Sequence, residues 1–295
     1  PPKLQKPSLS LACMLLFPYL CTENNNSMIK FMSLGSGSSG NSYYLQAGST
    51  SLLIDAGISP RIMKKHLKGV GVALEDIDAV FVTHDHADHI KAIGYLANDL
   101  GKPVYTTELV HQGINRNFCL NGKLDSEHVR IIQKNVPVQV GECSLTAFDV
   151  PHDSTDCVGY RVEAGGVTFC LLTDVGHVTA TLEEQVSLAN YIVLESNHDE
   201  NMLMMGNYPA YLKGRIRGPK GHLSNNTSAH LLAEHATPRL KHVWLCHLSE
   251  ENNHPELARK TMESVCRSYG IVPGKDFAMD ILKRKSPSEL YELKP

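Results

Sequence analysis

The sequence shows no cysteine pattern that would define a class of protein. Its eight cysteines include no CxxC pair. Several stand in apolar runs, such as Cys170 in VTFCLLT and Cys246 in HVWLCH. We interpret them as buried reduced thiols, which excludes a disulfide framework and predicts a cytoplasmic protein.

An excess of charge of either sign is also absent. The 28 Lys and Arg stand against 31 Asp and Glu, so the formal net charge is −3 and no global positive field indicates nucleic-acid binding. Any site for a polyanion must therefore be local. Hydrophobic residues make up 42% of the 295 residues, which is enough to bury a core, and no internal repeat, long linker or low-complexity tract divides the chain. One domain is the simplest interpretation.

The first 27 residues do not share the pattern of the rest. They begin without Met and hold a short apolar stretch, Leu9–Leu20. A secretory signal is one interpretation, but Pro18 interrupts the stretch and no A-x-A cleavage site follows. The stretch is also too short to span a bilayer, and we expect no membrane segment elsewhere. We predict that residues 1–27 are a leader outside the fold and that residues 28–295 form the domain.

From Met28 onward, short runs rich in β-branched and aromatic residues alternate with helix-like runs. Ten strands are predicted between Ile29 and His247, each bounded by Gly, Asp or Pro. The N-terminal strands follow one another with few helices between them, which favours two packed sheets covered by helices over one doubly wound sheet. The predicted helices are Arg61–Lys68, His89–Leu100, Glu108–Asn117, Thr181–Leu188, Pro209–Arg217, Thr227–His235 and Glu256–Ser268.

The segment AVFVTHDHADHI holds four possible metal ligands within six residues. A buried strand, Ala79–Thr83, is followed by His84, His86, Asp88 and His89 in a tight turn before a helix. Imidazoles and carboxylates are ligands of zinc, manganese and iron. His84 and His86 lie two residues apart, so both rings point to one side of an extended chain, while Asp88 and His89 can face a second point. The spacing suits two metals, and a solvated polar loop is the weaker interpretation.

The HDHADH run resembles the HxHxDH signature of the metallo-β-lactamase superfamily, whose fold is an α/β sandwich (αββα) of two mixed sheets flanked by helices. Further marks of that superfamily follow in its order: Asp55 after SLLI, His152 in DVPHDS, Asp174 ending VTFCLLTD and His247 ending HVWLCH. Each of them alone could be an ordinary loop residue. Their shared place at strand ends, where a fold gathers its loops, favours a functional site.

The resemblance, which covers about Met28 to Ile281, implies two divalent metal ions. It implies that Asp55 supports the metal loop and that Asp88 is both a ligand and a catalytic residue. No cysteine falls in these positions, so zinc, manganese and iron all remain possible. Two such ions can clamp a phosphate and supply a hydroxide. The implied ligands are His84, His86 and His152 for one ion, Asp88, His89 and His247 for the other, and Asp174 bridging both.

The run LKGRIRGPKGHLSNN adds a local positive charge of the kind that a polyanion requires. Arg and Lys pair with phosphate oxygens, so the run favours phosphodiesters over β-lactams, thioesters and lactones. An exposed helix end is the alternative interpretation. His222 follows the run, and similarity to phosphodiesterase branches implies that it contacts the scissile phosphate or protonates the leaving group. The four cations are Lys213, Arg215, Arg217 and Lys220.

Segments such as MSLGSGSSGNSYYL, LESNHD and CHLSEENNHPELA resemble the YycJ/WalJ group of bacterial 5′→3′ exonucleases. This similarity implies that the partner and substrate is a nucleic acid, DNA. Asn41 and Asn197 are weaker candidates for substrate contacts. Two alternatives stay open: a small-substrate phosphodiesterase, for instance on cyclic phosphates, and a non-catalytic regulator that binds nucleic acid.

Overall fold

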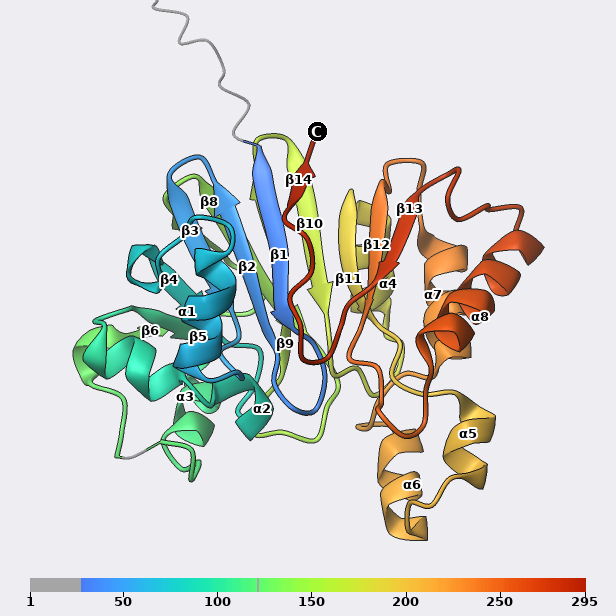
Figure 1. The fold of residues 1–295 in the computed structure, drawn as a ribbon, viewed down its shortest axis with the longest axis horizontal. Helices are drawn as coiled ribbons and strands as arrows, with labels where there is room; N and C mark the ends of the chain where they lie inside the picture. The colour runs from blue at the N-terminus through green and yellow to red at the C-terminus, as the bar shows by residue number, and fades with distance from the viewer. Residues whose placement is uncertain (1–27, 121) are drawn as a thin grey trace, which may run out of the picture.

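A computed structural model describes residues 28–120 and 122–295, so the predicted leader lies outside the described residues. The chain forms two seven-stranded mixed sheets that pack face to face, with helices on both outer sides (Figure 1). This confirms the predicted αββα sandwich. Within the described part of the chain, no helix has the length and apolar character needed to cross a membrane.

The first sheet contains the N-terminal strands and one strand from the C-terminus. Its order is β14-β1-β2-β3-β4-β5-β6, with antiparallel pairs at one side and parallel pairs from β3 onward. The bounds are β1 Ile29–Gly35, β2 Ser42–Ala47, β3 Thr50–Ile54, β4 Ala79–Phe81, β5 Val104–Thr106, β6 Val129–Ile131 and β14 Tyr291–Leu293.

The second sheet mirrors this arrangement. Its order is β13-β12-β11-β10-β9-β8-β7, and β10 to β13 are parallel, so their carboxyl ends meet at one edge. The bounds are β7 Pro137–Val140, β8 Cys143–Asp149, β9 Val158–Ala164, β10 Val167–Leu172, β11 Tyr191–Glu195, β12 His242–Cys246 and β13 Ala278–Ile281.

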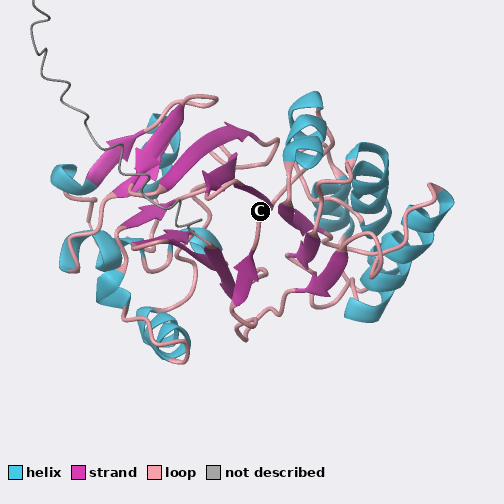
Figure 2. Ribbon diagram, turned by 90° about the horizontal axis from the view of Figure 1, so that it is seen from above, coloured by secondary structure: helices cyan, strands magenta, loops and turns pink. Residues whose placement is uncertain are grey.

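Three buried apolar clusters hold the layers together. The central cluster, which includes Phe31, Phe169 and Trp244, lies between the two sheets. The outer clusters pack α1 to α3 on the first sheet and α4, α7 and α8 on the second, as the flanking helices in Figure 2 show. The helix bounds are α1 Pro60–Lys68, α2 Ala87–Ile90, α3 Glu108–Ile114, α4 Ala180–Leu188, α5 Glu200–Met205, α6 Ala210–Arg217, α7 Asn225–His235 and α8 Pro255–Ser268.

The predicted helix His89–Leu100 is wrong as one continuous element. The chain instead forms the single turn α2 and then a π-helical turn, Tyr95–Asp99. The backbone N–H of Ala92 donates to the carbonyl of Ala56, 2.8 Å away, so the chain is fastened to the loop after β3 and cannot continue the helical ladder. Such irregular turns often lie at functional sites.

Candidate metal centre

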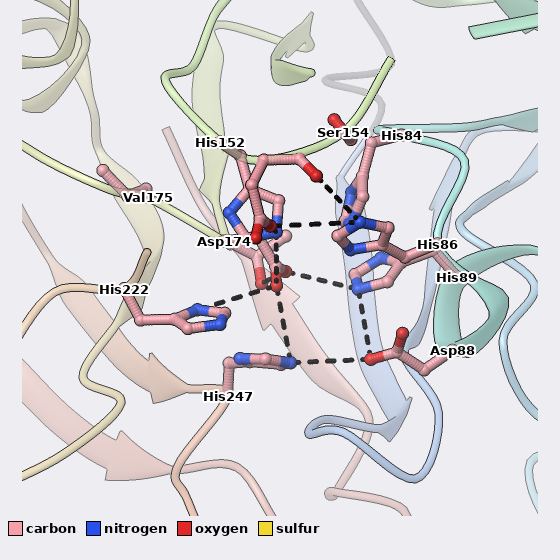
Figure 3. A network of polar contacts seen from close by, with 12 residues as sticks. His84, His86, Asp88, His89, His152, Ser154, Asp174, Val175, His222 and His247 are labelled. Carbon is pink, nitrogen blue, oxygen red and sulfur yellow. Dashed lines mark hydrogen bonds and ion pairs between the residues drawn. The ribbon is translucent and has the colours of Figure 1, made fainter. Parts of the chain in front are cut away.

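The predicted ligands gather at one edge of the sandwich, on loops that follow strands of both sheets. The His84–His89 loop follows β4 of the first sheet. His152, Asp174 and His247 follow β8, β10 and β12 of the second sheet. Figure 3 shows their side chains pointing toward one another across the space between the sheets. All seven residues predicted as ligands therefore lie together at this edge.

The ligand atoms form two clusters that share a carboxylate. Within each group that could hold an ion, the nitrogen and oxygen atoms lie within 4.8 Å of one another. Asp174 groups with one histidine from each cluster, His84 and His89, and so lies between them. The first cluster is His84, His86 and His152, and the second cluster is Asp88, His89 and His247.

Distances around Asp174 show how it joins the two clusters. One carboxylate oxygen, Oδ2, lies 3.3 Å from Nε2 of His89. The other, Oδ1, lies 3.7 Å from Nε2 of His152 and 3.6 Å from Nε2 of His247. Burial would raise the pKa of Asp174, but the neighbouring imidazoles of His247 and His89 hold that pKa well below its ordinary value. The carboxylate is therefore ionised and available to a cation.

The side chains of the two clusters are chemically suited to bind metal ions. Nε2 of His84 and Nε2 of His247 are buried and have no hydrogen-bond partner. An unpaired buried polar atom is costly, and a metal ion bound to these two nitrogens would remove that cost. Burial holds the pKa of His84 well below its ordinary value, which keeps its ring neutral with a free lone pair. Divalent transition metals bind neutral imidazoles and ionised carboxylates. Burial would lower the pKa of His89 and His247, but the neighbouring carboxylates raise both, that of His247 to about 10, so these two rings bind a metal with release of a proton.

The protein holds Nδ1 of three of the ligand rings, those of His89, His152 and His247. Nδ1 of His89 donates to Oδ2 of Asp55 at 2.7 Å, and Asp55 also accepts from the backbone N–H and hydroxyl of Thr83. Nδ1 of His152 donates to the carbonyl of Gly221 at 3.1 Å. Nδ1 of His247 lies 3.2 Å from Oε1 of Glu195. Such contacts fix the tautomer and the direction of a metal-binding ring.

The backbone at three of these strand ends is left-handed. Asp55, Asp174 and His247 have φ values of 63°, 56° and 53°. Residues other than glycine enter this region at a cost and do so mainly at functional sites. Next to Asp55, Gly57 packs so closely that a Cβ there would lie 1.6 Å from the carbonyl oxygen of Asp88, so only glycine fits.

Glu195 is a site residue that the sequence analysis missed. It ends β11, is fully buried, and accepts from Nδ1 of His222 at 2.9 Å. Burial would raise the pKa of Glu195, but His222 and His247 lower it to about 2. Its other oxygen accepts from the backbone N–H groups of Val175 and Leu223. An acid at the end of the apolar run YIVLE was the available signal.

His222 belongs to neither of the two clusters but to a further group that could hold an ion, with Asp174, Glu195 and His247. Its Nδ1 is occupied by Glu195, and its ring lies 5.1 Å from that of His152 and 5.2 Å from that of His247. The ring is partly exposed and lines a cavity of about 360 Å³ together with Arg217 and Ser224. His222 therefore borders both the clusters and an open space beside them.

The predicted cations lie on or just after α6, a helix without buried residues. Arg215 pairs with Asp153, the neighbour of His152. Lys213 donates to the carbonyl of Met204, while Arg217 and Lys220 are exposed. The structure thus brings this run to the edge of the first cluster.

The two predicted amide contacts, Asn41 and Asn197, are buried among the site loops. Asn41 Nδ2 lies 2.9 Å from Nε2 of His89, and Asn197 Nδ2 donates to the carbonyl of His247 at 2.9 Å. Both side chains therefore fasten the loops of the second cluster.

Comparison with known proteins gives the family of this chain. Residues 50–247 match the model of the beta-lactamase superfamily domain. The chain belongs to the metallo-β-lactamase superfamily. Within the superfamily it is 37% identical over 248 residues to the exodeoxyribonuclease WalJ of Streptococcus pneumoniae, covering 84% of this chain and 92% of that one. It is 33% identical over 262 residues to the exodeoxyribonuclease YycJ of Bacillus anthracis, covering 89% and 98%. The protein is thus a metallo-hydrolase related to these exodeoxyribonucleases.

Two solved structures share the fold at low sequence identity. The Bacillus subtilis protein YhfI superimposes with a TM-score of 0.66 at 21% identity, covering 90% of this chain and 99% of that one. Yeast PDE1 superimposes with a TM-score of 0.67 at 10% identity, covering 90% and 99%. These likenesses support the sandwich architecture alone.

Proposed function

We propose that the protein is a metal-dependent phosphodiester hydrolase that degrades DNA as a 5′→3′ exonuclease. The observation that supports this most is the double cluster around Asp174, because two adjacent cations suit in-line displacement at a phosphate. The relation to the exodeoxyribonucleases WalJ and YycJ supports DNA as the substrate.

In this proposal each cluster holds one divalent ion, and Asp174 contacts both. The first cluster supplies three imidazoles and the second supplies two imidazoles and the Asp88 carboxylate. Such a nitrogen and oxygen set accepts zinc, manganese or iron. When bound, two ions supply Lewis acidity to a phosphoryl oxygen and a nucleophile at neutral pH.

The chain's own residues then orient the substrate and move the proton. Asp88 Oδ2 lies 3.8 Å from Nε2 of His247 and 3.7 Å from Nε2 of His89, so this carboxylate is directed at the point where the second ion would be held. Glu195 holds the Nδ1 proton of His222. Nε2 of His222 is left to carry a proton to the leaving oxygen. Arg217 and Lys220 bind neighbouring phosphates, since they are exposed and positive.

The experiment is an assay of the purified protein on DNA duplexes labelled at either the 5′ or the 3′ end. Zinc, manganese and iron are supplied separately, and bis-p-nitrophenyl phosphate and a cyclic nucleotide serve as comparison substrates. We expect immediate release of the 5′ label as mononucleotide and gradual shortening of the 3′-labelled strand. His84→Ala is the control for contaminating nucleases. Faster turnover of the cyclic nucleotide than of DNA contradicts the proposal, and so does DNA binding without hydrolysis.

A further inference from the structure

A second set of positive charges lies beside the metal centre, on the connection between β13 and β14. Lys283, Arg284 and Lys285 follow one another there, and both lysines are exposed. The β13–β14 connection, which contains this 283–285 segment, descends to the lower, loop-bearing edge in Figure 1, the edge below which α6 projects. Three consecutive cations in a chain of net charge −3 concentrate positive charge at one place.

Backbone contacts fasten the 283–285 segment to two loops of the site. The carbonyl of Lys283 accepts from the backbone N–H of Ser36 at 3.1 Å. The Arg284 guanidinium donates to the carbonyl of Ser249 at 3.2 Å, and its side chain packs against Gly37. The Arg284 side chain therefore has a structural role, while the two lysines are exposed on a backbone that these contacts hold in place.

The same loops contact the second cluster directly. The hydroxyl of Ser36 accepts from the backbone N–H of His247 at 3.0 Å, and Ser249 lies two residues after His247. On the other side, Arg215 of α6 pairs with Asp153, which lies 3.4 Å from Nε2 of His152 in the first cluster. The 283–285 segment and α6 thus border different clusters of one centre.

The surface at the 283–285 segment is concave. A cavity of about 360 Å³ is lined by the segment and by Leu248, Glu250 and Pro255. One of the lining residues is acidic, Glu250, and it lies 3.6 Å from Nζ of Lys285. Both side chains of that pair are exposed, so the pair is weak and a phosphate can replace it at little cost.

We propose that the 283–285 segment is a second binding site for the phosphodiester backbone of DNA. One strand then crosses the metal centre from the cations of α6 to Lys283 and Lys285, with the reacting phosphate between them. This inference rests on the proposed function, because it assumes that the substrate is a polyanion longer than one nucleotide.

The test compares two double variants that remove the same charge. Lys283→Ser with Lys285→Ser removes the exposed lysines and leaves Arg284 in place. Arg239→Ser with Lys275→Ser is the matched control, because both residues are exposed and precede β12 and β13, at the opposite edge of the sheet. Binding of the metal-loaded proteins to a phosphorothioate DNA duplex is followed by fluorescence anisotropy between 50 and 200 mM salt, and hydrolysis is measured on ordinary DNA.

Loss of two phosphate contacts makes the plot of log affinity against log salt shallower by about 1.8. Over this fourfold salt range the wild type should therefore weaken about 12-fold more than the Lys283/Lys285 variant. The control should follow the wild type. Hydrolysis of a dinucleotide, which is too short to reach the segment, should be the same in all three proteins.

Each other outcome has a definite meaning. If the wild type degrades DNA and the Lys283/Lys285 variant keeps the wild-type salt slope, the second site is wrong while the proposed function stands. If the variant loses dinucleotide hydrolysis as strongly as DNA hydrolysis, the lysines support the site loops and bind no phosphate. If the wild type neither binds nor degrades DNA, both proposals are wrong.

Discussion

The metal centre and the α5–α6 hairpin lie side by side but are built in opposite ways. In the metal centre His84, His89 and Asp174 are almost completely buried, and the rings are held by further hydrogen bonds. The hairpin has one buried residue, Leu203, and leaves Met205 and Tyr211 88% and 78% exposed. Many contacts fix a geometry, whereas few contacts allow side chains to adapt.

This difference separates two tasks of the proposed enzyme. Ion binding and proton transfer require atoms held within a few tenths of an ångström, which only packed and hydrogen-bonded side chains provide. Binding a charged backbone of any sequence requires positive charge on adaptable side chains, which an exposed helix provides. Substitutions in the metal centre should therefore remove chemistry, and substitutions in the hairpin should change affinity and salt response.

The strongest test of this division is removal of a shared ligand. Asp174→Ala and His84→Ala should each lose at least one of two ions per chain, because each side chain belongs to a group that could hold an ion. Hydrolysis of every substrate should fall by more than about 10⁴-fold, the upper range for loss of a general acid. Elemental analysis of the purified variants measures the ions. Retention of two ions in both variants would show that the clusters are assigned wrongly.

Removal of His222 should separate proton transfer from ion binding. Because Nδ1 of His222 is occupied by Glu195, His222→Ala should keep both ions yet lose about 10²–10⁴-fold in kcat. A phosphodiester with an activated leaving group should lose less, since its leaving oxygen needs little protonation. Glu195→Gln should give the same pattern with a smaller loss. If His222→Ala loses an ion while His247→Ala keeps both, then His222 is the metal ligand and His247 is not.

Removal of a supporting hydrogen bond should have an intermediate effect. Asp55→Ala leaves the ligands of both clusters in place but removes the acceptor of His89 Nδ1 and of Thr83. Metal affinity should fall about 10–100-fold. Competition with a chelator measures the change, and Asp55→Asn is the isosteric control that retains an acceptor oxygen. Equal metal affinity in Asp55→Ala and the wild type contradicts this positioning role.

The smallest effect on chemistry is expected in the hairpin. Arg217→Ser with Lys220→Ser should leave metal content and dinucleotide hydrolysis close to wild type, since neither side chain belongs to a cluster. DNA affinity should fall, and its salt slope should become shallower by about 1.8. The Arg239/Lys275 control variant should retain the wild-type slope. If the Arg217/Lys220 variant keeps the wild-type salt slope of DNA affinity, these cations bind no phosphate and belong to an exposed, solvated helix end.

The sequence predicted those parts of the site that carry a local signal, either a short motif or a polar residue at the end of an apolar strand. The HDHADH run shows its alternation directly, and Asp174 and His247 end apolar strands that are easy to recognise. Glu195 could not be predicted as a site residue, because its partner His222 lies 27 positions away in the sequence. A single acidic residue in a strand forms no motif with its neighbours.

Long-range contacts explain the missed fold elements as well. The edge strand β14 has no pattern of its own and forms by pairing antiparallel with β1, more than 250 positions earlier. The break after α2 depends on the N–H of Ala92 finding the carbonyl of Ala56. Neither contact follows from local propensity, because tertiary partners decide both conformations.

Each cluster takes ligands from loops of both sheets. In the first cluster His84 comes from the first sheet and His152 from the second, and in the second cluster His89 and His247 do the same. An ion bound in either cluster is thus a cross-link between the two halves of the sandwich. It stabilises the folded chain by mass action, by about 2.7 kcal/mol at a free concentration 100 times its Kd. In the proposed enzyme, the ions that serve hydrolysis would therefore also stabilise the contact between the two sheets, and metal depletion should lower the free energy of unfolding.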